Sequence, residues 1–303
     1  MRYFSRFNAF DPYFAFTVNG SRIGLAPHYE YGRMVSESAF DEVLFLPEVE
    51  EGAARRFRLP RGSKPSACQL LRHLKHVYGI AEFRVGRRFP AGLFHEMRRS
   101  GLKVTVEDNG GLLPQREIKT AEELAALRKA NRASAAGFRV VSRTLAEARV
   151  RRGVLHHQGR VLTSERLREM IQHACLDAGA MAMHTIASAG DQVVDNHCVG
   201  RGPIRAGELI VVDIFPQRIE DGYWGDMTRT YLKGRASDAQ RRLVRTVRKA
   251  HRLAMDMIKP GVRGGRVHEE VEGLFAREGY ETDRNPPEQK GFFHALGHAV
   301  GLE

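Results

Sequence analysis

Two aspartates and two histidines in the C-terminal half of the chain have the types and spacing of metal ligands. Asp213 and Asp226 lie in VVDIFPQRIEDGYWGDMTRT, and His294 and His298 lie four residues apart in GFFHALGHAVGLE. Divalent cations take carboxylate oxygens readily, and the imidazole of histidine is a common ligand of the same metals. These residue types therefore indicate a candidate site for a divalent cation.

The residues around the two aspartates predict a β-hairpin. ELIVVDIF is a β-branched apolar run, and Asp221-Gly222 tolerates the positive φ angles of a two-residue loop. In that register Asp213 faces Thr230, whereas a loop two residues earlier would set Asp213 directly opposite Asp226. Side chains alternate along a strand, so either register places both carboxylates on one face together with Thr228.

Two carboxylates on one face of a sheet need a positive partner. Like charges opposed across a ladder are destabilising, and an unpaired buried carboxylate is costly. Arg229 alternates onto the other face, so a divalent cation is the better candidate. The alternative is that one aspartate caps the turn and the other is solvated, and the hairpin alone leaves both interpretations open. The histidine pair, with glycines on both sides of His298 that allow close backbone approach, favours the metal.

Two α/β domains are expected to position these residues. Residues 1–115 alternate short strand-like runs with amphipathic stretches, and NGGLLPQREIKT reads as a linker. In residues 116–303 we expect a long helix after Thr120, whose Glu123 completes a capping box, and another after Thr163. Two further helices are expected, one capped by Ser237 and one over 267–278, with the strands that carry the candidate ligands between the second and third helices.

The chain has a net charge of +12, which raises the question of nucleic-acid binding. Its densest basic run is AQRRLVRTVRKAHRLAMDMI, in which apolar residues recur at spacings of four and three. The spacing predicts a helix with one apolar face and a solvated basic face. We therefore do not expect a nucleic-acid partner. The apolar positions are Leu243, Val247, Ala250, Ala254 and Met257.

Three cysteines, Cys68, Cys175 and Cys198, lie far apart without a CxxC spacing, so reduced structural thiols are expected. The first residues show no leader-like apolar stretch, and no segment approaches the roughly 18 apolar residues of a membrane span. These features predict a cytoplasmic location and no membrane partner.

Four stretches of the sequence carry a family resemblance: HCVGRGPI, VVDIF…GDMTRT and FFHALGHAVGLE, preceded by QREIKTAEELAALRKA. Together they resemble the pita-bread metallopeptidases, which include Xaa-Pro aminopeptidases, prolidases and methionine aminopeptidases. Residues 1–115 resemble the creatinase-type N-terminal domain of the Xaa-Pro branch, and residues 116–303 the catalytic domain. The resemblance implies a mixed α/β (α+β) fold in which helices flank a curved sheet. It also implies two divalent metal ions (Mn, Co or Zn), a metal-activated water that cleaves Xaa-Pro bonds of proline-containing peptides, and a homodimer.

The resemblance assigns a role to each candidate residue. Asp213 would bind one metal through both oxygens, Asp226 would bridge the two ions, and His298 would complete one coordination shell. The catalytic histidines would be His197, which contacts the substrate or the tetrahedral intermediate, and His294, which helps to hold the substrate. Thr228 would orient one of the metal-binding carboxylates.

Two departures from the family pattern change what is expected. The two aspartates are two residues further apart than usual, an even number that preserves the shared face. The family also supplies two glutamate ligands further downstream, and Glu303, the last residue, matches neither. We therefore expect three of five ligands, a C-terminally truncated domain without its last strands, and impaired hydrolysis. The alternative is a catalytically inactive pita-bread module that binds peptides or proteins.

Overall fold

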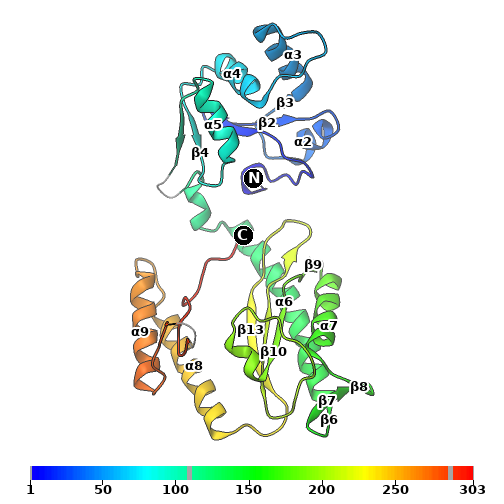
Figure 1. Ribbon diagram of the computed structural model, residues 1–303, viewed down its shortest axis with the longest axis vertical. Helices are drawn as coiled ribbons and strands as arrows, with labels where there is room; N and C mark the ends of the chain where they lie inside the picture. Colours follow the sequence, from blue (N-terminus) through cyan, green and yellow to red (C-terminus); the bar gives the residue numbers. More distant parts are fainter. Residues whose placement is uncertain (1, 108–110, 286–288, 303) are drawn as a thin grey trace. The chain divides into compact units, whose positions relative to one another are not determined.

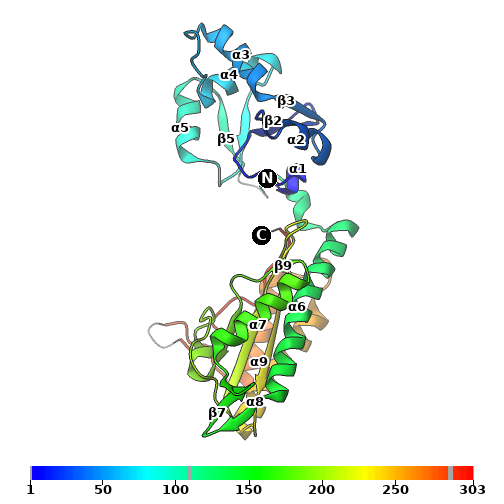
Figure 2. The ribbon, with the colours of Figure 1, turned by 90° about the vertical axis from the view of Figure 1, so that its right-hand side faces the viewer.

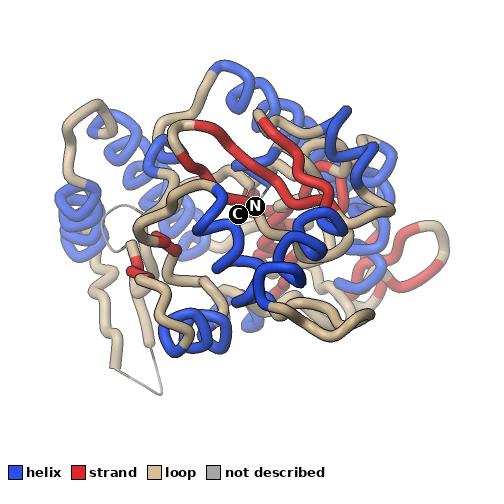
Figure 3. Tube along the Cα trace, turned by 90° about the horizontal axis from the view of Figure 1, so that it is seen from above, coloured by secondary structure: helices blue, strands red, loops and turns tan. Residues whose placement is uncertain are grey.

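The computed structural model describes residues 2–107, 111–285 and 289–302. The chain divides into two compact units, Met1–Lys119 and Thr120–Glu303, and both contain helices and strands. Figure 3 shows the helices and strands of the whole chain in different colours. The expected boundary lies a few residues earlier, and residues 109 and 110 of the expected linker, like Glu303, lie outside the described residues. The creatinase-type assignment of the first unit stays a prediction.

The first unit contains two small sheets (Figures 1 and 2). In one, β1 (Ala15–Val18) pairs antiparallel with β2 (Ser21–Ala26), which pairs parallel with β3 (Glu42–Phe45). In the other, β4 (Phe83–Val85) and β5 (Val104–Val106) run parallel, an arrangement that needs a crossover connection such as a helix. The helices are α1 (Arg2–Ser5), α2 (Tyr31–Glu37), α3 (Leu46–Phe57), α4 (Ala67–Val77) and α5 (Ala91–Arg99), and a 3-10 turn, η1, covers Pro114–Glu117.

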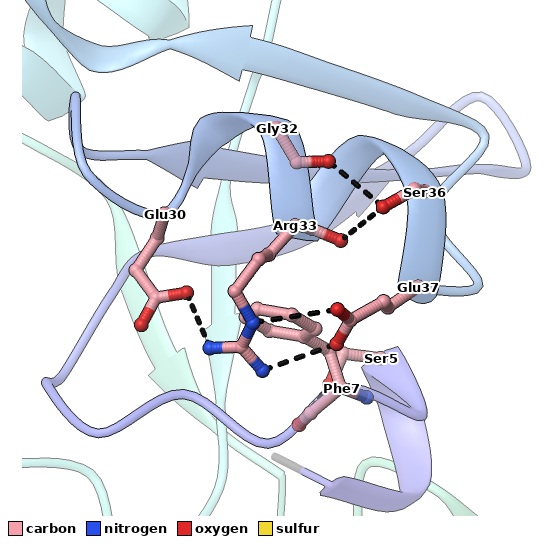
Figure 4. A network of polar contacts seen from close by, with 7 residues as sticks. All are labelled: Ser5, Phe7, Glu30, Gly32, Arg33, Ser36 and Glu37. Carbon is pink, nitrogen blue, oxygen red and sulfur yellow. Dashed lines mark hydrogen bonds and ion pairs between the residues drawn. The ribbon is translucent and has the colours of Figure 1, made fainter.

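A polar network fastens α2 in the first unit (Figure 4). The guanidinium of Arg33 lies 2.8 Å from a carboxylate oxygen of the buried Glu30 and 3.1 Å from one of Glu37. The same guanidinium stands 5.0 Å from the ring centroid of Phe7, a cation–π distance. Because Glu30 is buried, its pairing with Arg33 matters more for stability than the exposed pair with Glu37.

The second unit is built around a three-stranded antiparallel sheet. β11 (Leu209–Ile214) lies between β10 (Ile186–Ala189) and β13 (Met227–Leu232). Helices α6 (Ala121–Glu147) and α7 (Ser164–Asp177) lie beside it (Figures 1 and 2). Both begin where the sequence predicts, because Thr120 forms its capping box with Glu123 and Thr163 accepts a hydrogen bond from the N–H of Arg166.

The main core of the second unit lies between these two helices and the sheet. Phe138 and Val141 of α6 and Ile171 of α7 pack with Ile210 and Val212 of β11. The helix α6 approaches closely at Gly137, where an added Cβ would stand 2.9 Å from the Ile214 side chain. Short elements complete this region: β6 (Arg149–Arg151), β7 (Val154–His157), β8 (Arg160–Val161), β9 (Ala180–Met181), the 3-10 turn η2 (Gly190–Val194) and β12 (Gln217–Arg218).

The basic helix α8 (Asp238–Met257) pairs with α9 (Gly264–Arg277), and Ser237 forms the predicted capping box with Gln240. Ala250 and Ala254 of the predicted apolar stripe are buried, but Val247 is 47% exposed, so the stripe is covered over only part of its length. The last helix begins three residues before the predicted position 267. Within the described ranges, no helix is both long and apolar enough to cross a bilayer.

Candidate metal centre

The hairpin forms, but with its turn between the two predicted positions. Asp213 faces Thr228 across β11 and β13, and Ile214 faces Met227. Beyond β11 the chain continues into β12, which pairs with β9, and Gln217 forms a bridge with Trp224. The turn therefore closes around residues 219–222, so neither predicted pairing of Asp213 is correct. The shift is again even, and it keeps position 226 on the same face as Asp213 and Thr228.

Asp213 is a partly buried carboxylate whose charge lacks full solvation. The Thr228 hydroxyl donates a hydrogen bond of 2.5 Å to its Oδ1. Burial raises the pKa of the Asp213 carboxyl above its usual range, and the neighbouring Asp226 carboxylate raises it further. The Thr228 hydrogen bond and the nearby imidazoles of His298 and His197 act in the opposite direction, without reversing the shift. The site therefore favours added positive charge.

Asp226 and His298 meet directly. The Nε2 atom of His298 lies 3.4 Å from Oδ2 of Asp226, and the Nδ1 atom lies 3.1 Å from the Ala299 carbonyl oxygen. When Nδ1 carries the proton and donates to that carbonyl, the Nε2 atom of a neutral ring presents a lone pair to the carboxylate. Two acceptors facing each other need a proton or a metal cation between them.

The donor set therefore fits a divalent cation in its chemistry, with two carboxylates and an imidazole fixed by its other nitrogen. The described residues do not form a closed coordination shell: among them, no three His, Cys, Asp or Glu side chains already stand in a metal-holding arrangement. His298 is also open to solvent, with its side chain 73% exposed, whereas that of Asp226 is 30% exposed.

Helix α6 fixes the main chain at Asp226, which the sequence did not reveal. The Asn131 side chain donates to the Leu127 carbonyl oxygen, and its Oδ1 accepts a 3.2 Å hydrogen bond from the Asp226 N–H. Gly225 touches the same helix, because a Cβ there would stand 2.6 Å from the Ala130 carbonyl oxygen. The glycine in WGD was the available signal for such an approach.

His197 lies on an exposed loop that α7 holds in place. Arg168 donates to the carbonyl oxygens of Val199 and Gly200, at 2.6 and 2.5 Å. The Gly202 N–H donates to the Glu165 carboxylate. The loop brings His197 close enough to Asp213 to influence that carboxyl electrostatically.

His294 lies in the same C-terminal segment as His298 but is exposed. Its Nδ1 lies 2.8 Å from the Ala295 carbonyl oxygen, and its ring contacts Phe292 and Phe293. In the described part of the chain, no hydrogen bond or ion pair links it to either aspartate. The structure therefore pairs Asp213 with Thr228 and Asp226 with His298, and the charges of Asp226, His298 and His197 act on the Asp213 carboxyl.

Comparison with known proteins identifies the family. The pattern of metallopeptidase family M24 matches residues 125–303, which is more than half of the chain. The chain belongs to this family. The predicted kinship with pita-bread metallopeptidases is thereby confirmed, and the family's members are metallopeptidases by description.

Curated relatives of this M24 chain include Xaa-Pro dipeptidases. That of Pyrococcus horikoshii is 24% identical over 276 residues, which cover 90% of this chain and 71% of the relative. That of Lactobacillus delbrueckii subsp. lactis is 26% identical over 192 residues, which cover 62% of this chain but only 46% of the relative.

Solved structures confirm the predicted fold class of this M24 chain. The Xaa-Pro dipeptidase of Bacillus anthracis superimposes with a TM-score of 0.76 at 17% identity, covering 100% of this chain and 75% of the other. The prolidase of Pyrococcus furiosus gives a TM-score of 0.73 at 19% identity, with coverage of 100% and 77%. The fold is therefore that of prolidases, and this chain spans about three quarters of their length.

Proposed function

We propose that this chain belongs to a metal-dependent peptidase that hydrolyses Xaa-Pro bonds, with its metal centre at Asp213, Asp226 and His298. The observation that carries the proposal is the 3.4 Å approach of His298 Nε2 to Asp226 Oδ2, beside the partly buried Asp213. Xaa-Pro dipeptidases among the relatives support the substrate class.

The residues of the site divide the work between them. Thr228 would hold Asp213 by one oxygen, and the Ala299 carbonyl would keep the His298 ring turned with Nε2 toward Asp226. Divalent ions, when bound, supply Lewis acidity and a water of lowered pKa. We propose manganese, cobalt or zinc as the ion, because carboxylate and imidazole ligands suit all three.

The two remaining histidines are proposed to act on the substrate. His197 stands on the loop held by Arg168, where a donor could reach the carbonyl oxygen of a peptide near Asp213. His294 is exposed in the segment that carries His298, and we propose that it holds the substrate. Homodimerisation and a cytoplasmic location stay predictions.

Turnover is expected to be slow. The family pattern expects two further glutamates, one of them the general base that accepts the proton of the attacking water, and the matched motifs of this sequence supply neither. General-base catalysis is typically worth about 10² to 10⁴ in rate. The impairment predicted from the sequence is therefore part of this proposal, and metal binding is a more sensitive readout than activity.

The test combines Mn²⁺ calorimetry on metal-stripped protein with an assay of an Xaa-Pro dipeptide. We expect wild-type protein to bind Mn²⁺ and Asp226→Ala to lose binding and any measurable hydrolysis. Asp221→Ala, which removes a carboxylate from the turn of the same hairpin, is the matched control and should bind Mn²⁺ normally. Hydrolysis that persists unchanged in Asp226→Ala would reject the proposal, as would retention of proline peptides by wild type that chelator does not affect.

A further inference from the structure

Trp224 joins the two chain segments that carry the candidate ligands. Its main-chain N–H donates to the Gly301 carbonyl oxygen at 2.8 Å, and its indole Nε1–H donates to the Leu302 carbonyl oxygen at 3.3 Å. Trp224 stands two residues before Asp226, and Gly301 three residues after His298. In Figure 1 the C-terminal segment, in dark red, runs from α9 toward the start of α6.

The loop that carries Trp224 is held firmly on its other side. Trp224 forms a bridge with Gln217, and the Gly225 N–H donates to the Pro216 carbonyl oxygen at 2.8 Å. The Tyr223 hydroxyl donates to Glu123 of α6 at 3.0 Å. The loop is therefore a fixed element to which the C-terminal segment attaches.

The C-terminal segment has little regular structure of its own. Between α9 and residue 302, the described residues contain one isolated bridge, Asp283 with Lys290, and no helix or strand. The position of the exposed His298 side chain therefore depends on contacts such as those of Trp224. Leu296 packs against the core of α8 and α9 on one side of His298, and the Trp224 contacts hold the chain on the other, so few positions remain for the imidazole.

We propose that Trp224 is a positioning residue for the metal centre, because its two hydrogen bonds hold the main chain at 301–302 and so keep His298 against Asp226. The predicted effect on metal affinity rests on the proposed function. The hydrogen bonds themselves do not depend on it. Residues that orient metal ligands typically contribute 10- to 100-fold in affinity.

The first experiment measures Mn²⁺ affinity of metal-stripped protein by calorimetry. Trp224→Phe keeps an aromatic ring and the main-chain N–H but removes the indole donor, and we expect about 10-fold weaker binding. Trp224→His restores a ring N–H and should recover part of the loss. Tyr280→Phe, which removes a hydroxyl that accepts a hydrogen bond from Arg242 of α8 outside this loop, is the matched control and should bind Mn²⁺ as wild type does.

The second experiment uses the fact that Trp224 is the single tryptophan of the chain. Its intrinsic emission should change during Mn²⁺ titration of wild-type protein, with the same midpoint as the calorimetric isotherm. Emission that stays constant while Mn²⁺ binds would overturn the inference. Unchanged Mn²⁺ affinity in a folded Trp224→Phe protein would do the same.

A third measurement separates the inference from the proposed function. Absence of Mn²⁺ binding by wild type and all variants would reject the proposed metal centre. Hydrogen exchange of wild-type protein then tests whether Trp224 holds the C-terminal segment. The same measurement serves if the variants fail to fold. The Trp224 amide should be protected through its bond to Gly301, and exchange at the rate of an unstructured amide would overturn the inference.

Discussion

The carboxylates of the candidate site need a compensating positive charge, and the side chains around them supply little of it. Asp213 receives a hydrogen bond from Thr228 and has Asp226 as a neighbour of like charge. The compensating groups are imidazoles, of which His298 is largely exposed. Partly buried carboxylates of this kind lower the stability of the folded protein but can bind a cation.

The first residue-scale prediction concerns Asp213→Asn. The raised pKa of Asp213 means that the folded protein disfavours its charged form, so the substitution should stabilise the metal-stripped protein. We expect a gain of roughly 0.5–1 kcal/mol in the free energy of unfolding, small because water still screens a half-buried group. Urea unfolding in chelator at pH 7.5 measures it.

The same variant should bind Mn²⁺ much more weakly, because an amide supplies no charge. Thr230→Ala changes an exposed residue of the neighbouring strand β13 and is the control. A less stable Asp213→Asn protein would contradict the interpretation of the pKa shift.

The second residue-scale prediction concerns Cys175, whose thiol is fully buried between α6 and α7. Burial raises the pKa of this thiol to about 11. The unfolded chain ionises first, so the contribution to stability is complete below about pH 8.5 and is lost as pH rises toward 11. Native protein at pH 8.5 should therefore react with iodoacetamide at Cys198, which is partly exposed, well before Cys175.

Mass spectrometry of the labelled peptides distinguishes the two thiols. If Cys175 were labelled as fast as Cys198 in native protein, the close packing of Cys175 against α6 near Gly137 would be contradicted. Unfolding in urea should make the two rates equal, which controls for intrinsic differences.

At the scale of elements, the site depends on how closely α6 approaches the hairpin. Asn131 accepts the N–H of Asp226, and Gly225 leaves no room for a side chain beside the Ala130 carbonyl oxygen. On the other side α7 holds the loop of His197 through Arg168. Two helices of the core thus fix the two loops that meet at the candidate metal centre.

This arrangement predicts opposite effects of two glycine-to-alanine changes. Gly225→Ala would place a Cβ 2.6 Å from the Ala130 carbonyl oxygen, and we expect destabilisation by about 1–3 kcal/mol with weaker Mn²⁺ binding. Gly265→Ala, in the first turn of α9 with open space around it, should stabilise by up to about 1 kcal/mol. Chemical denaturation measures both, and a neutral Gly225→Ala would contradict the close approach.

At the scale of the whole molecule, the two compact units have separate cores, and the candidate ligands all belong to the second. A ligand that binds only one unit stabilises only that unit. Metal should therefore act selectively on the unfolding of residues 120–303.

Differential scanning calorimetry tests this selectivity. Mn²⁺ at about 100 times its dissociation constant should stabilise the second unit by about 2.7 kcal/mol, which raises one unfolding transition by roughly 5–10 °C. The other transition should stay in place, and excess chelator should reverse the shift. Equal shifts of both transitions, or a shift that persists in Asp226→Ala, would contradict a single site in the second unit.

The sequence by itself determined the local features and the family. Capping boxes at Thr120 and Ser237 mark helix starts because each needs only residues three apart, and the strand period of two places Asp213 and Thr228 on one face in every even register. The motifs around Asp213, Asp226 and His298 were specific enough to indicate the M24 family.

Only the tertiary structure decided the turn of the hairpin and the groups that hold the ligands. The turn lies at residues 219–222 because β12 pairs with β9, a partner distant in sequence, and Asp221-Gly222 alone could not reveal that pairing. Asn131, Arg168 and Trp224 reach the site through one or two long-range hydrogen bonds each, which leave no periodic pattern in the sequence.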